Sequence, residues 1–178
     1  MIDRWIFGER GSAWDVFTVA GSLTSVLPSI GIVLDLDSGR PLPVAVRELT
    51  TLDHLAKGEL VVLFDLQLEG DLSRTLEAVH LLRQMWNHEV TTVNGDHWRL
   101  DEAPNRPQPL HRGALKVMFV ISEPTAEIEQ QAAANGVELL GVRSSPEGQR
   151  EHWIWLDDPG ISELLAERER FGGGRSGS

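Results

Sequence analysis

The residues of this 178-residue chain that could do chemistry are acidic and polar side chains directly after hydrophobic stretches. Asp35 and Asp37 end the stretch SIGIVLDLD. Asp157 and Asp158 end EHWIWLDD, and Ser122 ends ALKVMFVIS. Side chains in such places either take part in a reaction or simply finish strands and cap helices. The sequence leaves both roles open for these five residues.

Taken in order along the chain, these stretches resemble the motifs of the haloacid dehalogenase-like phosphohydrolases. That family has a hydrophobic strand ending in Asp-x-Asp, a second ending in Ser or Thr, and a later acidic pair that holds Mg²⁺. The resemblance implies Asp35 as the nucleophile and Asp37 as the acid and base. It also implies Ser122 as a ligand of the phosphoryl oxygens. Asp157 and Asp158 would complete a Mg²⁺ site, a role that suits hard carboxylate oxygens.

The chain departs from the pattern of that family at three points. The family has a parallel α/β fold, whereas residues 1–50 are expected to form hairpins. Ser38 and Gly39 follow Asp37 and are typical of a hairpin turn, where the family usually has a small residue and Thr. The family also has a lysine between its second and fourth motifs, and here only Arg143 and Arg150 could replace it. The Mg²⁺-dependent phosphohydrolase is therefore an alternative. On the main interpretation we expect no catalytic residue, no metal and no cofactor.

Composition excludes several other chemistries. The chain has no cysteine, so disulfides, thiolate nucleophiles and cysteine-bound zinc are excluded. It also contains no Gly-x-Ser-x-Gly turn and no phosphate loop with Gly-Lys-Ser/Thr. The six histidines lack the His-x-His and His-x-x-x-His spacings of metal sites. They are His54, His80, His88, His97, His111 and His152.

The net charge of −11 argues against a nucleic acid as the main partner, because a phosphate backbone would be repelled on average. Arg106, Arg112 and Lys116 lie close together, however, so a nucleic-acid-binding module stays as a second alternative. No apolar run approaches the ~20 residues of a membrane helix, and the first residues lack the pattern of a secretory signal. We therefore expect the protein in the cytoplasm or in a particle assembled there, with no membrane partner.

The elements that must position these residues begin, in the sequence, with two hairpins. Residues 4–8 and 13–21 are rich in strand-forming residues and flank the turn ERGS. Residues 29–37 and 43–49 flank a second turn, SGRPL. A short helix is expected over 50–58, between a threonine cap and a terminal glycine.

From residue 59 onward the pattern predicts a duplicated unit. Strand 60–69 and helix 72–87 precede a hairpin at Asn94-Gly95, and a strand, a helix and two further strands follow in the second half. A shift of 55 residues aligns His97-Trp98 with His152-Trp153. The repeated order of elements favours duplication of a strand–helix–strand–strand unit.

These patterns together predict an α+β fold. Two strand–helix–strand–strand units, in the order of a ferredoxin-like fold, would share a mainly antiparallel sheet preceded by N-terminal β-hairpins. Residues 1–58 would hold the hairpins and the short helix, and residues 59–171 the duplication. The two units would span 59–104 and 114–171, joined by a proline-rich link at 103–113. Residues 172–178 are flexible by composition.

The sequence indicates its helices and strands clearly, but its polar residues match no known pattern of a catalytic site. We therefore expect a non-enzymatic structural or interaction subunit of a larger assembly, such as a component of a phage-like tail or neck. Its partners would be other protein subunits in a homo- or hetero-oligomer. Tryptophans often anchor such interfaces. The candidates are Trp5, Trp14, Trp98, Trp153 and Trp155.

Overall fold

The structure is a computed structural model. It describes residues 5–8, 15–24, 27, 29–56, 59–113, 115–121, 123–141 and 152–155. Within 5–8 and 152–155, and at residues 67, 68 and 141, the description covers the backbone and not the side chains.

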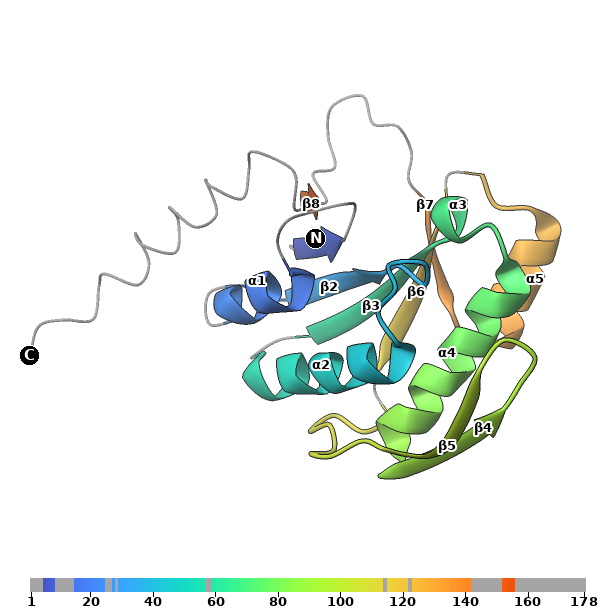
Figure 1. The fold of residues 1–178 in the computed structure, drawn as a ribbon. Coiled ribbons are helices and arrows are strands. Elements are labelled where there is room, and N and C mark those ends of the chain that lie inside the picture. Colours follow the sequence, from blue (N-terminus) through green and yellow to red (C-terminus); the bar gives the residue numbers. More distant parts are fainter. Residues whose placement is uncertain are drawn as a thin grey trace, which may run out of the picture.

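A parallel sheet of six strands is the central layer of the described molecule (Figure 1). The strand order is β7-β6-β3-β2-β1-β8, and every neighbouring pair in it is parallel. The central strands are near-continuous hydrophobic runs, as expected of parallel strands that are buried on both faces. The strands are β1 Trp5–Gly8, β2 Ser29–Leu34, β3 Glu59–Asp65, β6 Lys116–Ile121, β7 Glu138–Gly141 and β8 His152–Trp155.

Helices connect the successive parallel strands, because a chain must cross over before it can enter the next strand in the same direction. Helix α1 precedes β2, α2 precedes β3, and α5 precedes β7. Helices α1, α2 and α4 lie on the same face of the sheet (Figure 1). The helices are α1 Val16–Leu23, α2 Leu42–Leu55, α3 Leu66–Glu69, α4 Leu72–Asn87 and α5 Ala126–Ala134.

The core has two parts, one on each face of the sheet. The larger part lies between the sheet and the helices, and Phe64, Trp86 and Phe119 are its largest fully buried side chains. The smaller part lies on the opposite face, which we call the inner face. It consists of Val33, Val61, Leu63, Met118 and Val120, each no more than 8% exposed.

The strands follow one another around the sheet in the order of a (β/α) barrel. Strands β1, β2, β3, β6 and β7 are neighbours in chain order, and β8 then returns to pair with β1. Among the described residues the circle is not closed by a pairing of β7 with β8. Because these strands are all parallel, their carboxyl ends lie at the same edge of the sheet.

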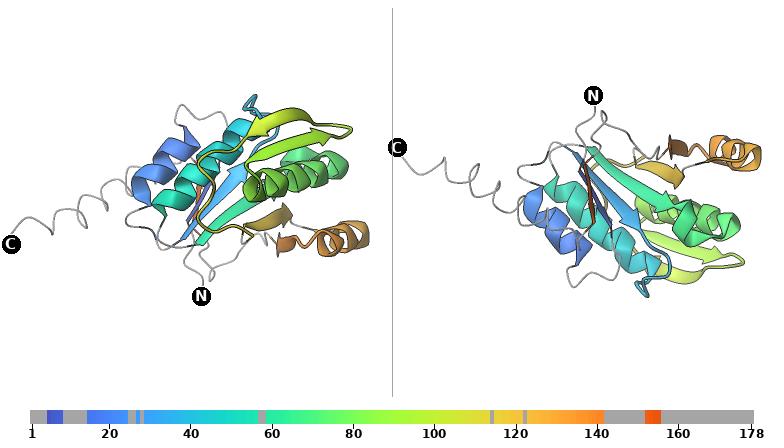
Figure 2. Two further views of the ribbon diagram at one scale, coloured as in Figure 1. Left: turned by 90° about the horizontal axis from the view of Figure 1, so that it is seen from below. Right: turned by 90° about the horizontal axis from the view of Figure 1, so that it is seen from above.

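A separate two-stranded antiparallel sheet lies beside α4, on the side away from β6 (Figure 2). It consists of β4 Val90–Asn94 and β5 Arg99–Pro104. The connecting turn contains Gly95, and the hairpin predicted at Asn94-Gly95 is therefore confirmed. Glu77 of α4 accepts hydrogen bonds from the backbone N–H groups of the turn, at 2.8 Å from Trp98.

The predicted α+β fold with a mainly antiparallel sheet is wrong, because the main sheet is parallel and its crossovers are helices. The first N-terminal hairpin is also wrong. Its second arm, residues 13–21, overlaps α1, in which the buried residues Val16, Val19 and Leu23 recur at helical spacing. Asp15 caps this helix by accepting the N–H of Thr18 at 2.7 Å.

The second N-terminal hairpin is wrong for a similar reason. Residues 43–49, taken for a strand because of their valines, lie within α2. The buried residues Leu42, Ala45 and Leu49 are three and four positions apart, so they form one side of a helix rather than one side of a strand. Of the short helix expected over 50–58, residues 50–55 form the end of this longer helix, and residues 57 and 58 lie outside the described residues.

The two predicted units do not pair alike, although their elements follow the expected order. Strands β4 and β5 pair with each other outside the main sheet. Strands β7 and β8 lie at opposite edges of the main sheet. His97-Trp98 therefore precede a strand of the small sheet, whereas His152-Trp153 open the edge strand β8, so the two pairs do not mark equivalent strands.

Within the described residues, no helix has the length and apolar character needed to cross a membrane.

Candidate functional site

Polar and charged side chains gather at the carboxyl ends of β2 and β3. We call this group, residues 35–40 after β2 together with Asp65 and Glu69 at the end of β3 and in α3, the carboxyl edge. Ligands of parallel α/β folds bind at this end of the strands. Leu34 pairs with Phe64, so Asp35 and Asp65 are the next residues along neighbouring strands.

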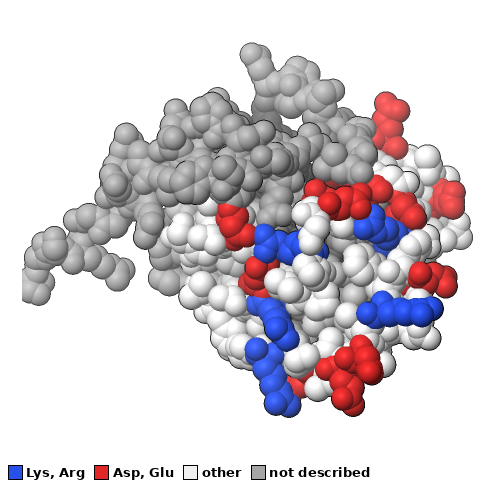
Figure 3. Space-filling model, in the orientation of Figure 1, with Lys and Arg blue, Asp and Glu red and all other residues white. Residues whose placement is uncertain are grey.

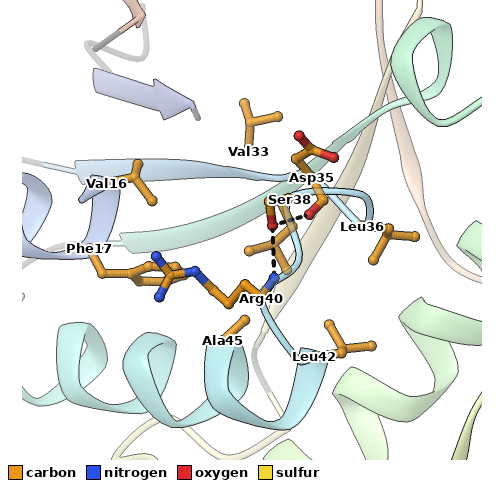
Figure 4. Close-up of a pocket in the computed structure, with 10 residues that line it drawn as sticks. Val16, Phe17, Val33, Asp35, Leu36, Ser38, Arg40, Leu42 and Ala45 are labelled. Carbon is orange, nitrogen blue, oxygen red and sulfur yellow. Dashed lines mark hydrogen bonds between the residues drawn. The ribbon is translucent and has the colours of Figure 1, made fainter. Parts of the chain in front are cut away.

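Asp35 lies half-buried in a tight turn and points to the same side of the sheet as Val33 (Figure 4). Its Oδ1 accepts the N–H of Asp37 at 2.8 Å, and its carbonyl accepts the Ser38 hydroxyl at 2.8 Å. Gly39 has φ = 79°, a left-handed conformation that glycine adopts without strain. One carboxylate oxygen thus serves the turn, while Oδ2 has no hydrogen-bond partner among the described residues.

Glu69, at the end of α3, is a buried carboxyl with one unpartnered oxygen. Its residue is 8% exposed, and Oε1 accepts the N–H of Leu36 at 2.9 Å. Its Oε2 is buried without a hydrogen-bond partner among the described residues. Burial raises the pKa of Glu69; the Leu36 N–H opposes this change, and the nearby charges of Asp35 and Asp37 add to it. Glu69 therefore keeps its proton to a higher pH than an exposed glutamate does.

Arg74 connects the carboxyl edge to the first turn of α4. It donates to Asp37 at 2.7 Å and to the carbonyl of Leu36 at 2.9 Å. Its guanidinium lies 5.8 Å from the centre of the Trp98 ring. Arg74 thus attaches the β2–α2 loop to α4, and its charge is already paired with the carboxylate of Asp37.

Arg40 makes a second connection, between α2 and α1. It donates from one nitrogen to both carboxylate oxygens of Glu48, each at 2.6 Å, and from another to Asp15. Its guanidinium lies 4.9 Å from the centre of the Phe17 ring. Since Asp15 also caps α1, this cluster fixes the start of that helix against the loop after β2.

A hollow opens between α1, the end of β2 and the start of α2 (Figure 4). Its volume of about 300 Å³ includes the part open to solvent, and the enclosed part, about 10 Å³, has room for about one water molecule. Most of its wall is apolar, including Val16, Phe17 and Val33. Asp35 and Arg40 are the charged residues of its wall.

Acidic side chains gather near α3 and the loop after β2, with basic side chains between them (Figure 3). Asp35 and Asp37 lie near the buried Glu69, because their charges contribute to raising its pKa. Within the residues that the structure describes, however, no group of three or more His, Asp or Glu could hold a metal ion.

Two of the five acidic and polar site residues named from the sequence lie at the carboxyl edge, namely Asp35 and Asp37. Ser122, Asp157 and Asp158 lie outside the described residues. The sequence interpretation missed Glu69, because the alternation of Leu66 and Leu68 extended the predicted strand to residue 69. Arg40 and Arg74 were missed as well, because no local sequence pattern indicates an ion-pair partner that lies far along the chain.

The tryptophans proposed as interface anchors are only partly described. Trp98 is half-buried and packs against the larger core, and its indole N–H is buried without a hydrogen-bond partner among the described residues. Trp14 lies outside the described residues. Trp5, Trp153 and Trp155 belong to the strands β1 and β8, for which only the backbone is described.

No family model matches the chain, and no curated protein matches it. Solved structures do match. The coenzyme F420-dependent tetrahydromethanopterin reductase from Methanopyrus kandleri matches 72% of this chain with a TM-score of 0.58 and 8% identity. The monooxygenase RslO1 from Streptomyces bottropensis matches 95% of this chain with a TM-score of 0.54 and 14% identity. The chain spans only 45% and 63% of those two proteins.

These matches correct the functional interpretation of the sequence. Two solved structures that share the fold are a reductase and a monooxygenase, so the structural subunit of a phage-like particle is the wrong interpretation. The phosphohydrolase alternative is wrong on the same finding. The nucleic-acid-binding module also fails, because it depended on a ferredoxin-like sheet that the chain does not form.

Proposed function

We propose that the protein is an oxidoreductase that binds a flavin-like cofactor at the carboxyl edge. The observation that carries this proposal is the shared fold with two redox enzymes, one of them dependent on coenzyme F420 by its name. The position of the polar group supports it, because enzymes with parallel strands in barrel order place their chemistry at the carboxyl ends of the strands.

The described residues fit the ring of such a cofactor. The inner face is a buried apolar layer that ends at the carboxyl edge, and a ring bound at that edge would lie over the end of this layer. The unpartnered Oε2 of Glu69 lies at the same edge and offers a hydrogen-bonding partner to a polar ring atom. When bound, a flavin-like cofactor supplies hydride transfer.

The protein's own groups would then position the ring and manage a proton. Glu69 keeps its proton to a higher pH because burial raises its pKa, and a carboxyl of this kind can exchange a proton during a reduction. Arg74 and Arg40 hold the loop after β2 in place through Asp37 and Glu48. Carboxylates thus already bind both arginines at this edge. The described residues therefore suit the ring of the cofactor better than a negatively charged tail of the cofactor.

The proposal is tested by titrating the protein with FMN and, separately, with coenzyme F420, while the fluorescence of the cofactor is followed. We expect saturable binding of at least one of them with a Kd below about 100 μM. The Glu69→Gln variant should bind more weakly, and the Asp101→Asn variant, altered at an exposed residue of β5, should bind as the parent does. Failure of both cofactors to bind at about 1 mM would contradict the proposal.

A further inference from the structure

Leu36 connects the buried carboxyl of Glu69 to the surface of the carboxyl edge. The residue is 8% exposed, and its side chain belongs to the larger core. Its N–H donates to Oε1 of Glu69 at 2.9 Å, and its carbonyl accepts a hydrogen bond from Arg74, also at 2.9 Å. The two peptide groups on either side of the Leu36 Cα atom are therefore each held by an ionisable side chain, one from α3 and one from α4.

The peptide group between Leu36 and Asp37 is held at both of its polar atoms. Its carbonyl accepts one nitrogen of Arg74, and its N–H donates to Oδ1 of Asp35 at 2.8 Å. A second nitrogen of Arg74 donates to the carboxylate of Asp37 at 2.7 Å. An arginine can make both contacts at once because its planar guanidinium carries several N–H groups. Arg74 therefore fixes the turn directly after the N–H that Glu69 accepts.

The position of Arg74 is unfavourable for α4 taken alone. Arg74 is the third residue of this helix, where the positive end of the helix dipole disfavours a cation. The capping Asp71 accepts its backbone N–H at 3.0 Å, but its side chain extends to the loop after β2. That side chain is only 26% exposed, and its guanidinium lies beside the Trp98 ring. Contacts outside the helix, rather than helix formation, thus account for this arginine.

The charged groups near Glu69 come from several elements, and Arg74 is the only cation among those described. The end of β6, against which α3 packs, adds only apolar residues as far as it is described. Burial raises the pKa of Glu69, the charges of the two loop aspartates add to this change, and the charge of Arg74 opposes it. The carboxylates of the β2–α2 loop, the end of β3 and the start of α4 are Asp35, Asp37, Asp65 and Asp71.

We propose that Arg74 is a positioning residue for Glu69. By holding Leu36, Arg74 keeps Oε1 of Glu69 on the Leu36 N–H, so that Oε2 stays free for a polar atom of the cofactor. Its charge also limits how strongly Glu69 retains a proton. The inference rests on the proposed function, because it names a residue that regulates the carboxyl proposed to meet the cofactor ring.

The first test needs no cofactor and follows the Leu36 N–H in amide NMR spectra of the nitrogen-labelled full chain. The chemical shift of this N–H should titrate with Glu69, whose carboxyl it contacts. In Arg74→Gln the midpoint of the titration should move to higher pH, because the charge that favours the ionised form of Glu69 is lost. Hydrogen exchange of the Leu36 N–H should become about tenfold faster, because the neighbouring carbonyl loses its charged donor.

Two further variants separate the hydrogen bonds of Arg74 from its charge. Arg99→Gln removes an arginine from an exposed position of β5, so it should change neither the midpoint nor the exchange. Arg74→Lys keeps the charge without the planar fork, so the midpoint should stay near that of the parent while the Leu36 N–H exchanges fast. The N–H of Leu82, a fully buried residue of α4, reports whether each variant is folded.

Two results would overturn the proposal. One is a folded Arg74→Gln variant with the midpoint and the exchange of the parent. The other is an Arg74→Lys variant that protects the Leu36 N–H as well as arginine does, since charge alone would then account for the effect. If Arg74→Gln does not fold, Arg74→Lys decides by itself.

The cofactor titration distinguishes this proposal from the proposed function. If FMN or coenzyme F420 binds, Arg74→Gln should weaken binding about as much as Glu69→Gln does, and the double variant should lose less than about twofold more. Full additivity would mean that Arg74 acts without Glu69, and the inference would be wrong although the redox function stands. If neither cofactor binds but the NMR results are as expected, the proposed function falls and the positioning of Glu69 by Arg74 stands.

Discussion

The behaviour of Glu69 is set by its surroundings rather than by its own chemistry. An exposed glutamate would be a solvated anion, but this one lies under the β2–α2 loop, with one oxygen on the N–H of Leu36 and the other without a described partner. Burial without a compensating hydrogen bond disfavours the charged form. The environment that makes Glu69 a candidate for proton exchange should therefore also make its ionised form destabilise the folded protein, to an extent that depends on pH.

We expect Glu69→Gln to stabilise the protein at high pH. Because the pKa of Glu69 is raised in the folded protein, the stability linked to its proton is present below the unfolded pKa and is lost as the pH rises through the folded pKa. Glutamine keeps an oxygen for the Leu36 N–H and never ionises. The gain should be about 1 kcal/mol at about pH 8 and smaller at about pH 4.5, measured by urea unfolding. A gain that does not depend on pH would show that ionisation is not the cause.

The hairpin of β4 and β5 is attached to α4 through one side chain. Glu77 accepts the N–H groups of Asp96, His97 and Trp98 with its carboxylate. Partial burial raises the pKa of Glu77, but these donors outweigh burial and lower the pKa below its ordinary value. Gly95 lies so close that an added Cβ would stand 1.9 Å from Oε1 of Glu77.

Gly95→Ala should therefore destabilise the protein by about 1–2 kcal/mol, because Glu77 must leave the turn and its N–H groups lose their acceptor. Chemical unfolding of the variant measures this cost. The matched experiment repeats the substitution in a Glu77→Ala background, where the clash is absent and the added cost should shrink to a few tenths of a kcal/mol. The same cost in both backgrounds would mean that the contact with Glu77 does not matter.

Other elements could be predicted from their own residues. Helix 72–87, expected from the sequence, is confirmed as α4 Leu72–Asn87; its apolar residues recur at helical spacing, and Asp71 caps it. The strand from residue 60 and the hairpin at Asn94-Gly95 were predicted from alternation and turn chemistry. The arms 13–21 and 43–49 were assigned wrongly, because valine-rich helices that are largely buried contain nearly as many strand-forming residues as strands do.

For the whole molecule, the consequence of a parallel sheet is that the central strands β2, β3 and β6 are buried on both faces, as far as the structure describes their side chains. The alternation of residues 60–69 in the sequence places Val61 and Leu63 on the same side of an extended strand as Asp65 and Glu69, which would leave that side partly exposed. In the structure both are fully buried in the smaller core on the inner face. The stability of the protein should therefore depend on this face as much as on the face that the helices cover.

Leu63→Ala should cost about 3 kcal/mol in free energy of unfolding, the range found for large-to-small changes in a packed core. Urea unfolding with tryptophan fluorescence measures it. Leu110→Ala, at a side chain that is 62% exposed, provides the control and should cost less than about 0.5 kcal/mol. A cost below about 1 kcal/mol for Leu63→Ala would contradict the buried inner face.

The sequence by itself determined the local elements of the second half, the absence of thiol chemistry, and the place of Asp35 at the end of a hydrophobic strand. Only the tertiary structure decided that the strands run parallel, that Asp35 stands beside Asp65, and that Glu69 is buried behind them. The physical reason is the distance along the chain over which each interaction acts. Periodicity and capping depend on residues within one or two turns, whereas strand direction depends on how the crossover helices pack against the sheet. The pairing of Arg40 with Asp15, and of Arg74 with Asp37, likewise depends on contacts between residues 25 and 37 positions apart, which no local pattern encodes.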